Sequence, residues 1–263
     1  MRLALAEVKP RPRRVAENLC ALEGVVSQVP TADLVAFPEL FLTGYSLGDS
    51  LHRLALRQGS KELSTLAEIA RRQDKWILAG APFESPARKG EIWNAAILVG
   101  PTGEVQVSGK RYLPNFGPFE EGLQFTPADS AQVLKTPFGR IGALICYEVF
   151  FPEVARKLAL QGAELLLAIS ASPVTSRSLF AKLIPARAIE NATGFAYVNR
   201  VGVEDSMVFD GGSTFCDPRG EPLDPAVHPL PEGQRILEYE LPLEEYSRYR
   251  PSRPVLRDIS LLA

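Results

Sequence analysis

Residues Gly139–Glu153 read GRIGALICYEVFFPE and place a cysteine at the end of a predicted strand. Arg140–Ile145 is mostly apolar, as expected of a strand that is covered on both faces. Pro152 then begins a predicted helix that ends at Gln161, because proline is favoured in the first turn of a helix. Cys146 therefore lies where a strand gives way to a helix, and it is either a small core side chain or a nucleophile on a rigid support.

Outward from this segment, strands and helices alternate through most of the chain. Apolar runs bounded by turn residues predict strands at Arg2–Val8, Leu34–Phe37, Trp76–Ala81, Leu165–Ile169, Phe195–Val201, Ser213–Cys216 and Arg235–Tyr239. Helical spacing predicts helices at Arg14–Val29, Leu51–Arg72 and Ser178–Asn191, and Asn94–Lys110 predicts a hairpin. This order predicts an α/β fold with helices packed outside the sheets. No linker divides the chain, so we expect a single domain spanning residues 1–263, with the Pro- and Arg-rich tail along its surface.

Composition restricts the classes of partner. The 263 residues are 46% hydrophobic and 23% charged, with a formal net charge of −2 and no basic block, so we expect neither a nucleic-acid partner nor an anionic membrane surface. No apolar stretch approaches the roughly 18 residues that a membrane span requires, and the N-terminal order of apolar and basic residues is wrong for a signal peptide. Three cysteines do not make a disulfide framework in a chain of this length, which favours a cytoplasmic location. Cys20 and Cys216 are expected in the core.

Several kinds of catalytic site are missing from the sequence. The two histidines, His52 and His228, do not lie at strand ends, so a Cys–His arrangement is not indicated. The spacings typical of metal sites and of phosphate or dinucleotide loops do not occur either, and we expect no metal and no cofactor. If Cys146 is a nucleophile, a group other than histidine has to activate it.

Three polar residues follow predicted strands and are candidates for one site. Glu39 follows Leu34–Phe37, Lys110 follows the hairpin, and Cys146 ends its own strand. Ligands gather outside strand ends in α/β sheets, so these side chains are expected to converge. The carboxylate then takes the thiol proton, while the ammonium and the backbone N–H of Tyr147 stabilise an oxyanion. The alternative is a core cysteine, a glutamate in a solvated turn and a surface lysine.

Together these segments resemble the nitrilase superfamily of carbon–nitrogen hydrolases. Its three marks occur in order as FPEL with Glu39, GKRYLPNF with Lys110 and ICYEVFFPE with Cys146, and the resemblance extends along nearly the whole chain. It implies an α-β-β-α sandwich, a Glu-Lys-Cys triad made of these three residues, and hydrolysis of an amide through a thioester.

Four stretches resemble more closely the glutaminase domain of glutamine-dependent NAD synthetase: FPELFLTGYSLGD, KRYLPNFGPFEEG, ISASPV and NRVGVEDSMVFDGGSTF. This resemblance implies an additional carboxylate near the triad at Glu121. The substrate-binding residues that it suggests, together with the neighbour of the nucleophile, are Tyr45, Phe116, Phe119, Tyr147, Ser172 and Arg177. For the aromatic residues, packing within the core or a loop is the alternative.

The chain departs from that glutaminase domain in two ways. Tyr147 occupies the position of a glutamate that contacts the substrate amino group, and Glu148, one residue later, should point in another direction. The family's NAD synthetase also continues into a large ATP-using domain, whereas this chain stops at residue 263. Either a separate ammonia-using synthetase receives the product, or the chain is an independent amidase.

We therefore expect an amide hydrolase that releases ammonia from glutamine or a similar small amide. A stand-alone ω-amidase or an N-carbamoyl amide hydrolase is the alternative within this chemistry. Acyl transfer to an amine, or a partner-dependent subunit, is the alternative of another class. By analogy with the family, the protein is expected to form a homo-oligomer, a dimer or larger.

Overall fold

Two β-sheets form the centre of the molecule, because the chain twice passes through a series of buried apolar strands. In the computed structural model, which describes residues 1–259, one sheet has the strand order β13-β14-β1-β2-β3-β4-β5 and the other β12-β9-β8-β7-β6. The strands of the first sheet are β1 (Arg2–Glu7), β2 (Leu34–Ala36), β3 (Trp76–Glu84), β4 (Ile92–Val99), β5 (Val105–Gly109), β13 (Ala226–Pro229) and β14 (Arg235–Glu240). Those of the second are β6 (Val133–Thr136), β7 (Gly139–Ile145), β8 (Leu165–Ser170), β9 (Gly194–Asn199) and β12 (Thr214–Cys216).

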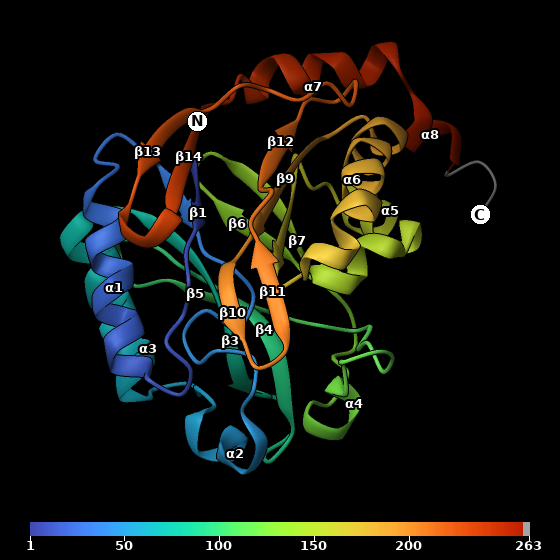
Figure 1. Ribbon diagram of the computed structural model, residues 1–263. Coiled ribbons are helices and arrows are strands. Elements are labelled where there is room, and N and C mark those ends of the chain that lie inside the picture. Colours follow the sequence, from blue (N-terminus) through green and yellow to red (C-terminus); the bar gives the residue numbers. More distant parts are fainter. Residues whose placement is uncertain (260–263) are drawn as a thin grey trace.

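Helices cover the outer face of each sheet. Figure 1 shows α1 (Val15–Ser27) and α3 (Lys61–Gln73) on one side of the strands, and α5 (Pro152–Leu160) and α6 (Arg177–Asn191) on the other. The other α-helices of the described residues are α2 (Leu51–Leu54), α4 (Glu121–Gln124), α7 (Leu243–Ser252) and α8 (Val255–Ile259). The arrangement is the predicted α-β-β-α sandwich.

Strand β1 shows why the sequence contains continuous apolar runs. Leu3 and Leu5 pack in the core that includes residues of β7, β8 and β9, whereas Ala4 and Ala6 pack with residues of α1 and α3. Successive side chains of a strand point to opposite faces, and here both faces are buried. Apolar side chains on both faces of β1 are buried, which holds this strand between the helices on one side and the second sheet on the other.

The structure corrects one predicted helix and adds further strands. The predicted helix Leu51–Arg72 is two helices, α2 and α3, because the chain between them is extended and pairs Leu56 with Phe83. The Ser60 hydroxyl accepts the N–H of Leu63 and so begins α3 anew. Strands β6 and β13 were not predicted, and β10 (Val201–Glu204) and β11 (Met207–Asp210) form a hairpin.

The two cysteines that were assigned to the core have different environments. Cys216 is buried in β12, as predicted. Cys20 is exposed, and its prediction was wrong. The buried stripe of α1 includes Val15, Leu19 and Leu22, and the adjacent position 20 lies off that stripe because helical residues on one face recur every three or four positions.

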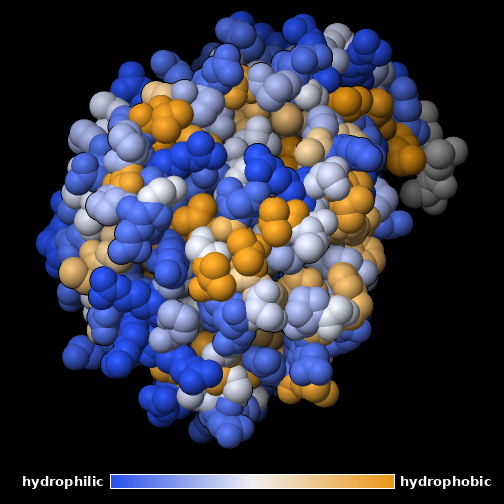
Figure 2. Space-filling model, in the orientation of Figure 1, coloured by the Kyte–Doolittle hydropathy of each residue, from blue (hydrophilic) through white to orange (hydrophobic). Residues whose placement is uncertain are grey.

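The chain after β14 forms α7 and α8, neither of which has a buried residue, so this tail lies along the surface as predicted. The four final positions of the predicted domain, 260–263, lie outside the described residues, and the single domain stays a prediction. Within the described part of the chain, no helix has the length and apolar character needed to cross a membrane. Figure 2 shows hydrophobic side chains on the face that carries β10 and β11 in Figure 1, and the exposed pair Val203 and Val208 belongs to this hairpin.

Gly80 of β3 allows the turn after β2 to lie directly on the sheet. Its N–H donates to the Pro38 carbonyl at 3.2 Å, and its carbonyl accepts the N–H of Leu42 at 3.1 Å. A Cβ at position 80 would lie 2.3 Å from the backbone nitrogen of Leu40. The turn that contains Glu39 therefore depends on a residue without a side chain.

We predict that Gly80→Ala lowers the free energy of unfolding by about 3 kcal/mol, because backbone has to move to admit the methyl group. Urea denaturation measures the change. The matched control is Gly24→Ala in α1, where a Cβ meets nothing within 4 Å, and alanine should raise helix stability by about 1 kcal/mol. Equal effects of the two substitutions would contradict the role assigned to Gly80.

Candidate active site

The ends of three strands meet at one place between the two sheets. Glu39 follows β2 and Lys110 follows β5, both in the first sheet, while Cys146 follows β7 in the second. β2 pairs in parallel with β1 and β3, and β7 pairs in parallel with β8. The carboxyl ends of these strands thus form the edge at which an α/β fold places its ligands.

The ammonium of Lys110 is fully buried between two carboxylates. Its Nζ donates to Oε1 of Glu39 and to Oε1 of Glu121, each at 2.7 Å. Burial by itself lowers the pKa of Lys110, but the negative charges of Glu121 and Glu39 outweigh it, and the net pKa is raised. Lys110 is therefore a permanent cation in this site.

Each carboxylate has further donors around it. Nδ2 of Asn94 in β4 donates to Oε1 of Glu39 at 2.7 Å, and the N–H of Ala171 donates to Oε2 of Glu39 at 2.8 Å. The Tyr45 hydroxyl donates to Oε1 of Glu121 at 2.6 Å. Burial, with Lys110 opposing it, raises the pKa of Glu121. The first sheet, the turn after β2 and the segment after β8 together hold the charged cluster.

Sequence reasoning missed Asn94 and Ala171. A signal for Asn94 existed, since an amide in an otherwise apolar strand is unusual and the hairpin pairs its neighbour Ala95 with Gly109, next to Lys110. Ala171 contributes only its backbone N–H, so no side-chain pattern could have identified it.

Cys146 lies at a sharp turn of the backbone. Its φ is +47°, a conformation that residues other than glycine rarely adopt, and it begins a short 3₁₀ helix, Cys146–Phe150. Tyr147 places its N–H in the first turn of this helix. Burial is the main effect that raises the pKa of the Cys146 thiol, and the charge of Glu39 adds to it. Lys110 and a hydrogen bond with the Ser170 hydroxyl act in the opposite direction, but the net pKa is raised. The resting thiol is therefore protonated and needs a base when it reacts.

Glu148 joins the Lys110 segment to the Cys146 strand. It is completely buried, and its two oxygens accept the N–H of Arg111 at 2.8 Å and the N–H of Ile145 at 2.9 Å. Its side chain is thus directed at the backbone of these two segments inside the protein. Burial raises the pKa of Glu148 to about 7, although the hydrogen bonds from the backbone lower it in part.

The four aromatic residues proposed for substrate binding form one continuous chain of ring contacts. Ring centroids are 6.0 Å apart for Tyr45 and Phe119, 5.8 Å for Phe119 and Phe116, and 5.1 Å for Phe116 and Tyr147. Tyr45 and Phe119 are buried, whereas Phe116 is 53% exposed. The chain of rings therefore extends from the charged cluster to the surface beside the nucleophile.

Ser172 and Arg177 line one cavity of about 310 Å³ between α6 and the ends of β8 and β9. Ser172 directly follows Ala171, the donor to Glu39. Tyr197 also lines this cavity, and its hydroxyl donates to Ser170, the partner of the Cys146 thiol. The cavity thus adjoins the charged cluster through two neighbouring segments.

The cation at this cavity is already paired. Arg177 is largely exposed, and its Nη1 lies 2.6 Å from Oδ2 of Asp210 in β11. Arg177 lines the cavity, and Asp210, which pairs with it, directly precedes the lining residue Gly211.

This arrangement supplies the groups that acyl transfer requires: a strand-end thiol, a buried carboxylate, a permanent cation and a backbone N–H. Within residues 1–259, no group of three or more His, Cys, Asp and Glu side chains is placed to hold a metal ion.

Comparison with known protein families gives one match that spans almost the whole chain. The model of the family described as "Carbon-nitrogen hydrolase" matches residues 2–251.

Individual relatives and structures agree with that match. "Hydrolase in pqqF 5'region" from Pseudomonas protegens is 35% identical over 221 residues, which are 84% of this chain and 76% of that protein. Glutamine-dependent NAD(+) synthetase of Thermotoga maritima is 34% identical over 231 residues, 85% of this chain but only 39% of the synthetase. Among solved structures, the NitN amidase of Nesterenkonia sp. AN1 is 32% identical, with a TM-score of 0.80 over 96% of this chain and 97% of that one.

We predict that Glu148 makes stability pH-dependent. Between the ordinary glutamate pKa of 4.5 and about 7, the folded protein keeps a proton on Glu148 that the unfolded chain has released. The free energy of unfolding should therefore fall as the pH rises through this window, by about 3 kcal/mol. Glu148→Gln cannot ionise and should lack this part of the slope in urea titrations at pH 5 and pH 7.5.

Glu153→Gln serves as the control for Glu148, because Glu153 is an exposed glutamate in the first turn of α5. It should keep the slope of the unmodified protein. The same pH slope in Glu148→Gln and in the unmodified protein would contradict the assignment.

Proposed function

Because this chain belongs to the carbon–nitrogen hydrolase family, whose amidases act on non-peptide amides, we propose that Cys146, Glu39 and Lys110 form its catalytic triad. The observation that carries the proposal is the fully buried Lys110 ammonium, 2.7 Å from Glu39 and close to the strand-end thiol. A cation that is buried in this way has little purpose in packing, but it stabilises an oxyanion well, since the interaction is stronger away from water.

In the proposed reaction, Glu39 takes the thiol proton as Cys146 Sγ attacks the amide carbon. The Lys110 ammonium and the Tyr147 N–H stabilise the oxyanion of the tetrahedral intermediate. Glu39 passes its proton to the departing nitrogen, so ammonia leaves and a thioester remains on Cys146. Water that is deprotonated by Glu39 then attacks the thioester, and the acid is released as the thiol regains its proton.

Glu121 has a supporting part in this scheme. It accepts hydrogen bonds from Lys110 and Tyr45. It is thus a second acidic group beside the ammonium, in addition to Glu39. We propose that it keeps the ammonium in place when Glu39 becomes protonated. The Nesterenkonia amidase supports a reactive thiol at the active site of a relative, since a Glu-to-Gln mutant of it carries acrylamide added to the active-site cysteine.

For the substrate we propose glutamine or a similar small primary amide. Ser172 and Arg177, which line the cavity, and Asp210, which pairs with Arg177, support glutamine, because an opposite-charge pair beside a hydroxyl can bind an α-carboxylate and an α-ammonium together. The similarity to the Thermotoga synthetase adds support. The second candidate is a stand-alone amidase for amides without an amino group, which Tyr147 favours because it stands where the glutaminase domain has an acid.

Two further parts of the proposal come from the family resemblance alone. They are a homo-oligomeric state and a separate ammonia-using synthetase as partner. A cytoplasmic location is proposed from the cysteine content instead.

We predict that Cys146→Ala and Glu39→Gln each reduce ammonia release from the best amide by at least about a thousandfold, because each removes a group that acts in the chemical step. Coupled detection of ammonia measures the rate with glutamine, propionamide and an N-carbamoyl amino acid. Cys20→Ser changes an exposed thiol of α1 and should keep the full rate. Undiminished activity in Cys146→Ala would refute the triad.

We predict that Arg177→Ala and Asp210→Asn each raise KM for glutamine by about tenfold, since each loses a charged hydrogen bond to substrate. KM for propionamide, which has neither charged group, should stay within about twofold. Equal changes for both amides would show that the pair does not contact the substrate. Hydrolysis of propionamide without hydrolysis of glutamine would favour the stand-alone amidase.

A further inference from the structure

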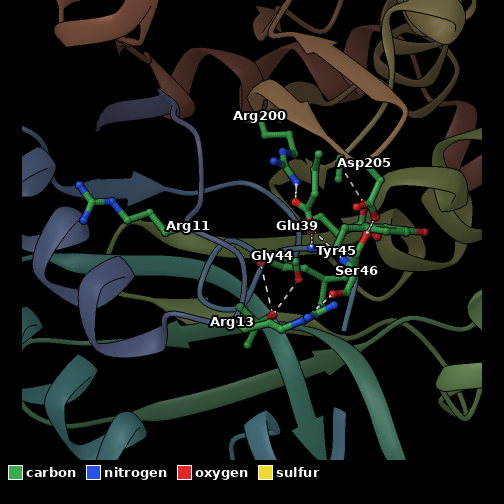
Figure 3. Close-up of polar contacts among 12 residues, drawn as sticks. Arg11, Arg13, Glu39, Gly44, Tyr45, Ser46, Arg200 and Asp205 are labelled. Carbon is green, nitrogen blue, oxygen red and sulfur yellow. Dashed lines mark hydrogen bonds and ion pairs between the residues drawn. The ribbon is translucent and has the colours of Figure 1, made fainter. Parts of the chain in front are cut away.

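The loop Thr43–Ser46, which carries Tyr45, is held from two opposite sides. Figure 3 shows it between Arg200 at the top of the view and Arg13 at the bottom. On one side, the N–H of Arg13 donates to the Thr43 carbonyl at 2.6 Å and its Nε donates to the Ser46 carbonyl at 3.0 Å. On the other, Oε1 of Glu204 accepts the N–H of Tyr45 at 2.8 Å and that of Ser46 at 2.7 Å.

Glu204 approaches this loop very closely. A Cβ at Gly44 would lie 3.2 Å from Oε1 of Glu204 and 2.9 Å from the Cα of Pro12. Gly44 also has a φ of +79°, in the region that favours glycine. The backbone at position 44 therefore lets the carboxylate reach two consecutive N–H groups.

Glu204 is itself fixed by a buried arginine. Its Oε2 is ion-paired with Nη1 of Arg200, and both side chains are almost completely inaccessible to water. The guanidinium of Arg200 lies over the ring of Phe209, 4.3 Å from its centroid. A buried pair with charged hydrogen bonds keeps its geometry, because breaking it leaves an uncompensated charge in the interior.

The contacts continue from this pair into the charged cluster. Glu204 holds the backbone of Tyr45, the Tyr45 hydroxyl donates to Glu121 at 2.6 Å, and Oε1 of Glu121 accepts from Lys110 at 2.7 Å. Burial, with the charge of Glu121, raises the pKa of Tyr45 well above its ordinary value, so the hydroxyl remains a donor. An unbroken series of hydrogen bonds thus connects β10 to the lysine.

We infer that Glu204 is a positioning residue for catalysis, which sets the place of Glu121 and Lys110 through Tyr45. It touches neither the thiol nor Lys110. The rate depends on it because a displacement of the lysine by a fraction of an ångström weakens its contact with the oxyanion. The rate readout rests on the proposed function, whereas the thiol readout described below does not.

The test is a double-mutant cycle of Glu204→Gln and Tyr45→Phe. In Glu204→Gln the amide nitrogen faces either Arg200 or the two loop N–H groups, so one set of donors loses its acceptor. In Tyr45→Phe the link to Glu121 is cut. We expect each single variant to lower kcat by about tenfold with KM within about threefold, and the double variant to be no slower than the slower single variant.

The second readout is the rate at which iodoacetamide alkylates Cys146, followed by peptide mass spectrometry at pH 7. It needs no substrate, so it tests the positioning even if no amide is hydrolysed. We expect Glu204→Gln, Tyr45→Phe and the double variant to slow alkylation of Cys146 to the same degree, about fivefold. The exposed Cys20 in the same molecule is the internal standard, and its rate should not change.

Val208→Thr is the matched control on the same hairpin, because Val208 is exposed on β11 and directly opposite Val203 in the hairpin. It should leave kcat and the alkylation rate unchanged. If Glu204→Gln does not fold, Arg200→Lys replaces it in the cycle, since lysine keeps the charge but cannot reproduce the guanidinium geometry. Multiplicative losses in the double variant, or an unchanged Cys146 rate in Glu204→Gln, would overturn the inference.

Discussion

A lysine ammonium that is removed from water has to be matched by negative charge, and the site is organised around this constraint at Lys110. Two carboxylates lie 2.7 Å from its Nζ, and neither could remain buried without donors of its own. Asn94, Tyr45 and the N–H of Ala171 supply these donors. Parts of both sheets and of the connecting loops are therefore bound to one another through a single cation.

The fold satisfies the constraint because it brings strand ends together from two sheets. The first sheet supplies Glu39 and Lys110, and the second supplies Cys146 on a left-handed backbone turn. Glu148 joins the two halves by accepting N–H groups from the segment after Lys110 and from the strand before Cys146. The charged cluster and the thiol thus keep a common geometry, although they belong to different layers.

Membership of the carbon–nitrogen hydrolase family defines the reaction class, whereas the substrate depends on the cavity wall. The guanidinium of Arg177 is already ion-paired with Asp210, so it is not an isolated positive charge. In the proposed function, a zwitterionic amide pairs with both groups, while a neutral amide needs neither. Tyr147 adds an aromatic ring directly after the proposed nucleophile, in contact with Phe116.

The sequence by itself predicted an α/β fold from its apolar runs and offered Glu39, Lys110 and Cys146 as candidates, because each follows a predicted strand. The resemblance of their motifs to the nitrilase superfamily implied the layered sandwich and the triad. Local patterns could not reveal that Leu51–Arg72 is interrupted, since the extended segment between the two helices pairs Leu56 with Phe83 of another element. Helical periodicity alone does place Cys20 off the buried stripe of α1. Only the tertiary structure decided that Asn94 and Ala171 donate hydrogen bonds to Glu39. The same holds for the buried Glu148, which links two backbone segments, and for Glu204, which accepts hydrogen bonds from the Tyr45 loop. These contacts join residues that are far apart in the chain, and a hydrogen bond exists only where the folded backbone brings donor and acceptor within about 3 Å.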